Sequence, residues 1–235
     1  REGDELVSAA VIGPGDEVIL VTSTGMAIRF KESDARPMGR NTSGVKGISL
    51  TSGDTVVGMV VAEPNATLLT VCENGYGKRT PFGPNAITED DDESDSENGN
   101  GSSSARYRTQ KRGGKGLRDI KTSDRNGKVI AIARVDDEDE IFLMTGKGKL
   151  QRIAARDIGV IGRNTQGVRI MNIEGDDSLI AAVRIPPEDE TEEVGDAVVP
   201  TAVTAAPAEN DASDETDTPA DSTPIDDAED QDSHE

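Results

Sequence analysis

The sequence is poor in aromatic residues, cysteine and histidine: 235 residues include no Trp, two Tyr, three Phe, one Cys and one His. A single cysteine excludes a disulfide within the chain and any metal site built from several thiolates. Cys72 lies in the apolar run LLTVC without a His or second Cys nearby, which indicates a small buried hydrophobe rather than a reactive thiol. His234 lies in a polar segment near the end of the chain, which favours a solvated spacer over a ligand or base.

Long hydrophobic runs are also absent. No apolar run approaches the roughly 20 residues that a membrane span requires, and we expect no signal peptide. We therefore expect a cytoplasmic protein with no membrane partner. The chain starts at Arg1 and enters a strand-like pattern at once, so we expect it to be a piece of a longer protein.

Basic residues are missing from two segments. Residues 187–235 contain 18 Asp and Glu without a Lys or Arg, and residues 89–97 contain seven more acidic residues without a base. Both segments have too little apolar surface to offset the entropy of ordering. We predict a disordered insertion at about 88–105 and a disordered acidic tail at 187–235. The net charge of −21 then divides into a mildly basic body, at about +4, and two acidic appendages.

A repeat with a period of about 50 residues runs through the body. Its first element is an apolar run with a glycine turn and a following arginine, in VILVTSTG, LLTVCENG and IFLMTGKG. Its second element is a glycine-containing turn, in GRNTSGV, KRGGKGL and GRNTQGV, and its third is a run rich in Val and Ile, in GDTVVGMVVA, GKVIAIARV and DSLIAAVRI. Short Val/Ile runs bounded by Gly, Asp, Asn and Ser are typical of strands. We predict an all-β, propeller-like fold over residues 1–186, with about three to four four-stranded blades, each formed by one repeat.

Lys and Arg recur at equivalent places in these repeats. In the stretch YRTQKRGGKGL and its flanks, six basic residues fall within thirteen positions, and adjacent glycines allow close approach of a partner. A generic basic turn of this kind is as often a solvated turn as a binding site. The recurrence instead predicts a basic track along one rim of the blades that binds the phosphates of duplex DNA. The candidate contacts outside residues 110–116 are Arg108, Arg118, Arg29, Lys31, Arg40, Lys46, Lys78, Arg79, Lys149, Arg152, Arg163 and Arg169.

The repeat texts over about residues 1–185 closely resemble the C-terminal domains of DNA gyrase A subunits. The resemblance is clearest in VDDEDEIFLMTGKGKLQRIAARDIGVIGRNTQGVRIMNI. The resemblance implies a β-pinwheel fragment, the last three to four of six blades. The family's heptapeptide Gln-Arg-Arg-Gly-Gly-Lys-Gly, which DNA wrapping needs, is matched at six of seven positions by Gln110, Lys111, Arg112, Gly113, Gly114, Lys115 and Gly116. In the family it lies in the first blade, whereas only about one and a half repeats follow it here. We interpret this segment as a late-blade copy, with the principal one upstream.

The resemblance also implies a partner set and a division of labour. The partners would be duplex DNA, the gyrase B subunit, and the rest of the gyrase A subunit, in an A2B2 enzyme. ATP and Mg would be bound by the B subunit, this chain would hold no cofactor or metal, and the DNA-cleaving tyrosine would lie outside it. Tyr107 has a similar local context to that tyrosine but lies in a β-repeat, so we do not assign it a catalytic role.

Two other hypotheses remain open from the sequence. The C-terminal domain of the topoisomerase IV counterpart has the same repeats but usually a degenerate heptapeptide. A propeller-like protein-interaction module would turn its basic rim toward acidic partners. Among weaker signals, residues 39–46 lack the Gly-Lys-Ser/Thr ending of a phosphate-binding loop, and the acidic pairs at 136–137 and 139–140 are typical of solvated hairpin turns.

Overall fold

The computed structural model describes residues 5–84 and 105–187. The predicted insertion and the predicted acidic tail lie outside these residues, apart from Ala105 and Pro187 at their edges. Within the described ranges the chain consists of strands and loops, with two single-turn 3-10 helices, η1 (Glu32–Asp34) and η2 (Ala155–Asp157). Neither of these short helices has the length to cross a membrane.

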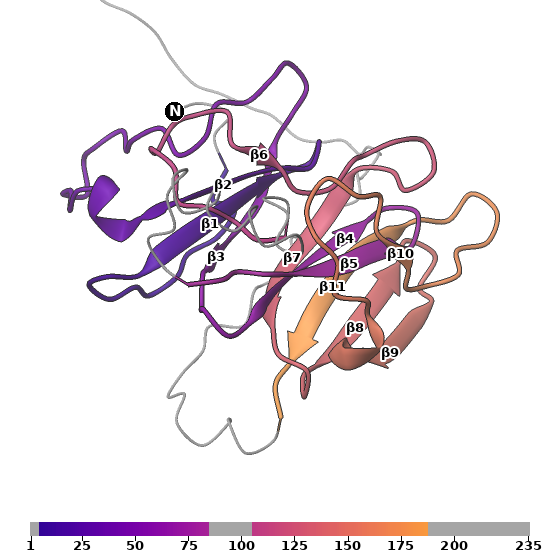
Figure 1. The fold of residues 1–235 in the computed structure, drawn as a ribbon. Helices are drawn as coiled ribbons and strands as arrows, with labels where there is room; N and C mark the ends of the chain where they lie inside the picture. The colour runs from indigo at the N-terminus through magenta and orange to yellow at the C-terminus, as the bar shows by residue number, and fades with distance from the viewer. Residues whose placement is uncertain (1–4, 85–104, 188–235) are drawn as a thin grey trace, which may run out of the picture. The chain divides into compact units, whose positions relative to one another are not determined.

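The strands form three antiparallel sheets, here called blades 1, 2 and 3 (Figure 1). Blade 1 has the order β3-β1-β2-β6, from β1 (Glu17–Thr22), β2 (Met26–Lys31), β3 (Val56–Val61) and β6 (Leu117–Arg118). Blade 2 has the order β7-β4-β5-β10, from β4 (Thr67–Cys72), β5 (Tyr76–Pro81), β7 (Val129–Val135) and β10 (Val168–Arg169). Blade 3 has the order β11-β8-β9, from β8 (Glu140–Thr145), β9 (Leu150–Ala154) and β11 (Leu179–Ile185). The all-β prediction is thus confirmed, and two of the three blades in the described residues have the four strands predicted, whereas blade 3 has three.

The short outer strand of a blade comes from the next repeat. Each repeat carries, between its second and third long strands, a connecting segment that we call a strap: strap 1 is residues 35–46, strap 2 is residues 107–118 and strap 3 is residues 158–169. Strap 2 ends in β6, which pairs with β2 of blade 1, and strap 3 ends in β10, which pairs with β5 of blade 2. The expectation that one repeat forms one blade was therefore wrong, because periodicity alone does not reveal which neighbour a segment pairs with.

Two buried apolar clusters lie on the two faces of blade 2, and a third lies in blade 1. Side chains alternate along β4: Leu68 and Cys72 belong to a buried cluster shared with blade 1, whereas Leu69 and Val71 belong to a cluster shared with blade 3. Each of these four side chains is at most 1% exposed. This explains why the sequence LLTVC is continuously apolar apart from Thr70, as expected of a strand buried on two faces.

Cys72 is the free thiol of this core. Its burial, followed by the nearby negative charges of Asp119 and Glu73, raises its pKa to about 12. The prediction of a small buried hydrophobe is confirmed, because a thiol that retains its proton is a poor nucleophile.

Candidate nucleic-acid interface

Strap 2, which contains the heptapeptide at residues 110–116, runs along the outer strand of the blade 1 hairpin before it forms β6. Thr109 makes a parallel bridge with Arg29 of β2. Strap 3 repeats this course on blade 2, where Val160 makes the same bridge with Arg79 of β5. Straps 2 and 3 therefore place equivalent residues at equivalent positions on consecutive blades.

Two positions in the strap require unusual backbone conformations. Gly113 has φ +83° and Gly116 has φ +77°, both in the left-handed region that disfavours a side chain. A Cβ at Gly116 would lie 2.4 Å from the carbonyl oxygen of Ala27, so a larger residue does not fit there. Strap 3 has Gly167, with φ +74°, in the place of Gly116 and Asn164, with φ +58°, in the place of Gly113. Asparagine is among the non-glycine residues that adopt this conformation most readily. This explains why GRNT in strap 3 has Asn where KRGG in strap 2 has Gly.

The predicted DNA contacts separate into three groups by exposure. The exposed side chains are those of Lys31, Arg40, Lys46, Lys111, Lys115, Arg118, Lys149, Arg152 and Arg169. The half-buried side chains are those of Arg108, Gln110 and Arg112. The buried side chains are those of Arg29, Lys78, Arg79 and Arg163.

Arg29 is a structural residue of blade 1. Its Nε lies 2.6 Å from the Glu17 carboxylate, and both side chains have almost no exposed surface. Its Nη1 donates to the carbonyl oxygens of Phe82, over 2.6 Å, and Tyr107, over 3.0 Å. Burial lowers the pKa of Arg29, and the charge of Glu17 opposes that effect. The prediction that Arg29 contacts DNA was wrong, since its side chain is buried and its guanidinium lies beside Glu17 and two carbonyl oxygens inside the protein.

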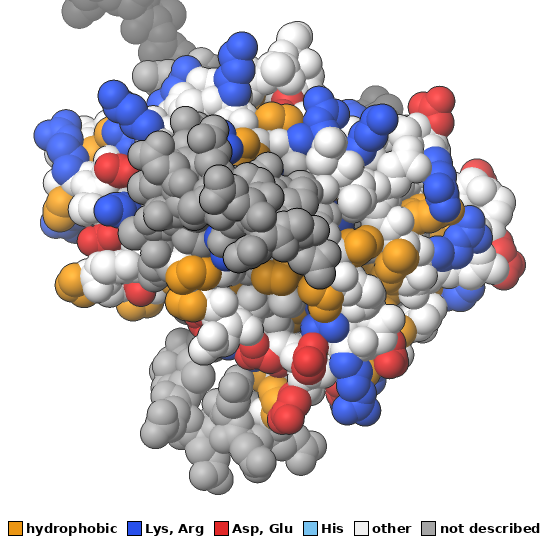
Figure 2. Space-filling view, viewed as in Figure 1, with side chains coloured by type: hydrophobic (Ala, Val, Ile, Leu, Met, Phe, Trp, Pro, Cys, Tyr) orange, Lys and Arg blue, Asp and Glu red, His pale blue; other side chains and the backbone are white. Residues whose placement is uncertain are grey.

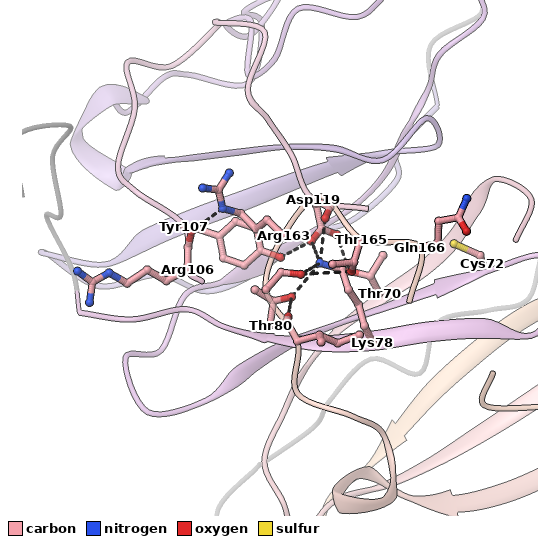
Figure 3. A network of polar contacts seen from close by, with 12 residues as sticks. Thr70, Cys72, Lys78, Thr80, Arg106, Tyr107, Asp119, Arg163, Thr165 and Gln166 are labelled. Carbon is pink, nitrogen blue, oxygen red and sulfur yellow. Dashed lines mark hydrogen bonds and ion pairs between the residues drawn. The ribbon is translucent and has the colours of Figure 1, made fainter. Parts of the chain in front are cut away.

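Lys78 occupies a similar buried position between blade 2 and strap 2 (Figure 3). Its Nζ lies 2.7 Å from the Asp119 carboxylate, and neither side chain has exposed surface. The same Nζ donates to the Thr80 hydroxyl over 2.9 Å and to the carbonyl of Gly162, in strap 3, over 3.2 Å. Burial lowers the pKa of Lys78, and the charge of Asp119 opposes the shift. The ammonium group therefore ties strap 3 and Asp119, the residue after strap 2, to β5, and it is buried out of reach of a phosphate.

Tyr107 completes this network rather than facing solvent. Its hydroxyl donates to Asp119 over 2.5 Å, and Asp119 also accepts from the Thr70 hydroxyl over 2.7 Å (Figure 3). Complete burial, then the charge of Asp119, raises the pKa of Tyr107 well above its ordinary value. Tyr107 serves to fix the start of strap 2.

Arg79 and Arg163 also have internal partners. Arg79 pairs with Asp137 over 2.5 Å and donates from Nε to the carbonyl of Ile158 over 2.9 Å. The Nε of Arg163 donates to the carbonyl of Arg106 over 2.6 Å. With Arg29 and Lys78, these residues form the part of the predicted DNA-contact set that the structure corrects. The repeated pattern of basic residues in the sequence did not distinguish those with internal partners from those at the surface.

Arg112 has a positioning role within the heptapeptide. Its Nε donates to the carbonyl of Asp34 over 2.8 Å, and its Nη1 donates to the carbonyl of Lys46 over 2.5 Å. A backbone hydrogen bond lies next to this contact: the amide of Gly113 in strap 2 donates to the carbonyl of Gly47, just after strap 1, over 2.8 Å. Arg112 thus anchors the turn that presents its neighbours, Lys111 and Lys115, to solvent.

One residue of the acidic turns, Asp139, differs from the prediction of solvated turns. Residues 136–139 form the turn between β7 and β8, as expected, but Asp139 is only 1% exposed. Its carboxylate accepts from the Asp136 amide over 2.7 Å and pairs with Arg184 of β11 over 2.7 Å. Asp139 is therefore a buried turn residue, not a solvated one. Among residues 5–84 and 105–187, the structure shows no group of three or more His, Cys, Asp or Glu placed to hold a metal ion.

The exposed basic side chains are spread over the straps and the hairpin ends. Figure 2 shows Lys and Arg side chains along the upper and right margins of one face. Some of these charges have local partners: Arg152 pairs with Glu140, and Lys149 donates to the carbonyl of Asn172 over 3.1 Å. Arg118 and Arg169 lie at the ends of β6 and β10 and form no ion pair with any described residue.

Arg125 is a basic surface residue that the sequence reasoning missed. It lies in the loop between β6 and β7, outside the repeated texts, so no pattern pointed to it. Its guanidinium lies over the ring of Tyr76 with 5.0 Å between guanidinium carbon and ring centroid, and the guanidinium of Arg169 lies over the same ring at 5.3 Å. The structure therefore brings Arg169, which was predicted, together with Arg125, which was not.

The fold and its surface define a class: a propeller-like repeat protein in which each outer strand comes from the following repeat and carries exposed basic residues. The family model described as DNA gyrase C-terminal domain, beta-propeller, matches residues 16–63, 103–136 and 139–186. The chain belongs to this family.

Curated relatives and solved structures agree with this assignment. The chain is 38% identical over 184 residues to the DNA gyrase A subunit of Escherichia coli K12 and 39% identical over 198 residues to that of Staphylococcus aureus NCTC 8325. These alignments cover 78% and 82% of the chain but only 18% and 20% of the relatives, so the chain spans about a fifth of their length. A solved DNA gyrase A C-terminal domain superposes with a TM-score of 0.60 at 27% identity, over 74% of this chain and 52% of that one. A topoisomerase IV C-terminal domain, 22% identical with a TM-score of 0.61 over 75% of this chain and 49% of that one, shares the fold.

Proposed function

We propose that this chain binds duplex DNA without sequence preference, as the C-terminal part of a DNA gyrase A subunit. The observation that carries the proposal is the equivalence of Arg118 and Arg169. In consecutive blades each is exposed on the outer strand, and each pairs with the first residue of the neighbouring strand, Met26 or Tyr76. One exposed charge per blade at the same register gives a series of phosphate contacts, which fix position on DNA but read no bases.

Lys111 and Lys115 extend this series on strap 2, on either side of the anchored Arg112. Bending 20 to 30 base pairs through a large angle costs about 1 to 6 kcal/mol. Contacts from several straps, acting together, would be needed to hold such a bend. The repetition of the strap on successive blades supplies that multiplicity.

In the complete protein this wrapping would support negative supercoiling by a type IIA topoisomerase. The partners would be the rest of the gyrase A subunit, together with the B subunit, which would bind ATP and Mg in an A2B2 enzyme in the cytoplasm. The DNA-cleaving tyrosine would lie outside this chain, whose own residues contribute binding and not chemistry. The relatives at 38% and 39% identity are gyrase A subunits, which favours gyrase over topoisomerase IV.

The proposal is tested by comparing two double variants of the full chain that remove equal charge. Lys115→Ala with Arg118→Ala removes strap charges, whereas Lys147→Ala with Arg156→Ala removes exposed charges outside the straps. Fluorescence anisotropy with a labelled random duplex at low salt gives both affinities. We expect the strap variant to weaken binding at least about tenfold, since two phosphate contacts are lost, and the control about twofold. Equal losses, or no DNA binding by the unmodified chain, would favour a protein-interaction module.

A further inference from the structure

Arg125 and Arg169 converge on Tyr76, the first residue of β5 in blade 2. Arg125 donates from Nε to the Tyr76 hydroxyl oxygen over 3.2 Å, and Arg169 donates from Nη2 to the same oxygen over 2.9 Å. The side chain of Tyr76 is 5% exposed, while both arginines are exposed. These residues line a pocket of about 290 Å³, together with Asn74, Ile173, Gly175 and Asp177.

The residues that line this pocket carry a net positive charge. Neither arginine forms an ion pair with a residue in the described parts of the chain; their other partners are the neutral oxygens of Gln166 and Asn172. Two guanidinium groups held on one ring repel each other. An anion between them would turn that repulsion into two attractive contacts.

Hydrogen-bond donors remain for such an anion. Arg125 uses Nε and Nη1 on its partners and Arg169 uses Nη1 and Nη2, so one nitrogen of each guanidinium has no partner among the described residues. A tyrosine oxygen has two lone pairs and one proton, and both lone pairs of Tyr76 accept from the arginines. Its proton has no acceptor in the described structure. The two hydrogen bonds, that from Arg125 first, also lower the pKa of Tyr76.

The wall of the pocket also contains one carboxylate, that of Asp177. Its Oδ1 accepts from the amides of Lys147 and Ser178, over 3.1 Å and 2.8 Å, so its charge is already stabilised by the turn before β11. The two arginines outnumber it, and the net charge of the pocket is positive.

We propose that the pocket formed by Tyr76, Arg125 and Arg169 binds one phosphodiester group of duplex DNA. The inference rests on the proposed function, because the argument for DNA rather than a free anion is position: Arg169 is the strap 3 equivalent of Arg118 and lies in the series of strap ends. In blade 1 the place of Tyr76 is taken by Met26. Of the two blades that carry a described outer strand, blade 2 alone therefore has this tyrosine platform, and it holds the duplex more firmly than blade 1 does.

The test uses the full chain with Arg125→Gln and with Arg156→Gln, a control that removes the same charge from an exposed site on η2. Affinity for a random duplex is measured across a salt series. Arg125→Gln should weaken binding about tenfold at low salt and reduce the steepness of the log–log salt dependence by about 0.9, the contribution of one phosphate. Arg156→Gln should change affinity less than about twofold. Tyr76→Phe, which keeps the ring, should weaken binding about threefold with an unchanged salt dependence, because it removes a hydrogen-bonding hydroxyl that carries no charge.

A second arm follows the ring resonances of the chain's two tyrosines by NMR during titration with inorganic phosphate. Tyr76 should shift saturably and Tyr107, buried beside Asp119, should not; Arg125→Gln should abolish the shift, and duplex DNA should displace phosphate. If the chain binds DNA but Arg125→Gln matches Arg156→Gln, the pocket proposal fails while the proposed function stands. Phosphate binding without any effect of Arg125 on DNA affinity would identify a free-anion site and overturn the DNA assignment. Absence of DNA binding by the unmodified chain overturns both.

Discussion

Lys78 of β5 and Asp119, the residue that follows β6, form an ion pair over 2.7 Å with no exposed surface on either side chain. The pair joins blade 2 to the strap that completes blade 1. Because Asp119 also accepts from Thr70 and Tyr107, its oxygens are satisfied within the core. The two blades are thus connected by a polar network as well as by apolar packing.

Removing one partner of this pair should destabilise the fold strongly. Lys78→Met leaves the Asp119 charge buried without its counter-ion, at a cost of about 3 to 5 kcal/mol. Urea denaturation of the full chain, followed by circular dichroism, measures the loss. The exposed Lys121 provides the control: Lys121→Met should change the free energy of unfolding by less than about 0.5 kcal/mol. Similar losses for both variants would show that the Lys78 ion pair does not stabilise the fold.

The sequence was informative about the repeat and much less so about which charges face solvent. Periodicity and strand composition predicted the all-β blades, and glycine positions predicted the turns. Exposure could not be predicted, because Arg118 and Lys78 are both basic residues of a repeated basic pattern. They differ in the residues that the fold places beside them. Asp119 comes close to Lys78 only because strap 2 pairs with blade 1. Arg125 was missed for the same reason: its partner Tyr76 lies 49 residues earlier in the chain.

The heptapeptide glycines should differ in their tolerance of a side chain. At Gly116 an added Cβ meets the Ala27 carbonyl at 2.4 Å, whereas at Gly113 the nearest atom lies at 3.4 Å. Gly113→Ala should cost about 1 to 2 kcal/mol for its left-handed backbone, and Gly116→Ala should cost more, because backbone must also move. Thermal unfolding of the two variants makes the comparison. In strap 3, Asn164→Gly relieves a left-handed non-glycine residue and should leave stability unchanged or slightly raised; a large loss there would contradict this account.

Stability should fall at alkaline pH through Tyr107. Its pKa in the folded protein is raised, first by burial and then by the charge of Asp119. The unfolded chain releases this proton near the ordinary tyrosine pKa of about 10, while the folded chain retains it. The contribution is therefore fully present below about pH 10 and is lost as pH rises beyond that value. Urea midpoints at about pH 8 and about pH 11 should differ less for Tyr107→Phe than for the unmodified chain, and equal differences would contradict the assignment.

The acidic tail should compete with DNA for the basic straps. Residues 187–235 carry 18 Asp and Glu and no Lys or Arg, and the rest of the chain retains all 25 Lys and Arg. Deleting residues 188–235 should therefore tighten binding to a random duplex at low salt, and the gain should shrink as salt screens the charges. Anisotropy titrations of the two forms at two salt concentrations measure the effect. An unchanged affinity at low salt would exclude competition by the tail.

The central claim is that exposed strap charges bind DNA through its phosphates. The most direct test is the dissociation constant of the full chain for two duplexes of unrelated sequence, measured from about 50 mM to about 200 mM salt. We predict one straight log–log line for both duplexes, steep enough to represent several phosphate contacts, since each contributes about 0.9 to the slope. Binding that differs strongly between the two sequences, or that does not change with salt, would contradict the claim.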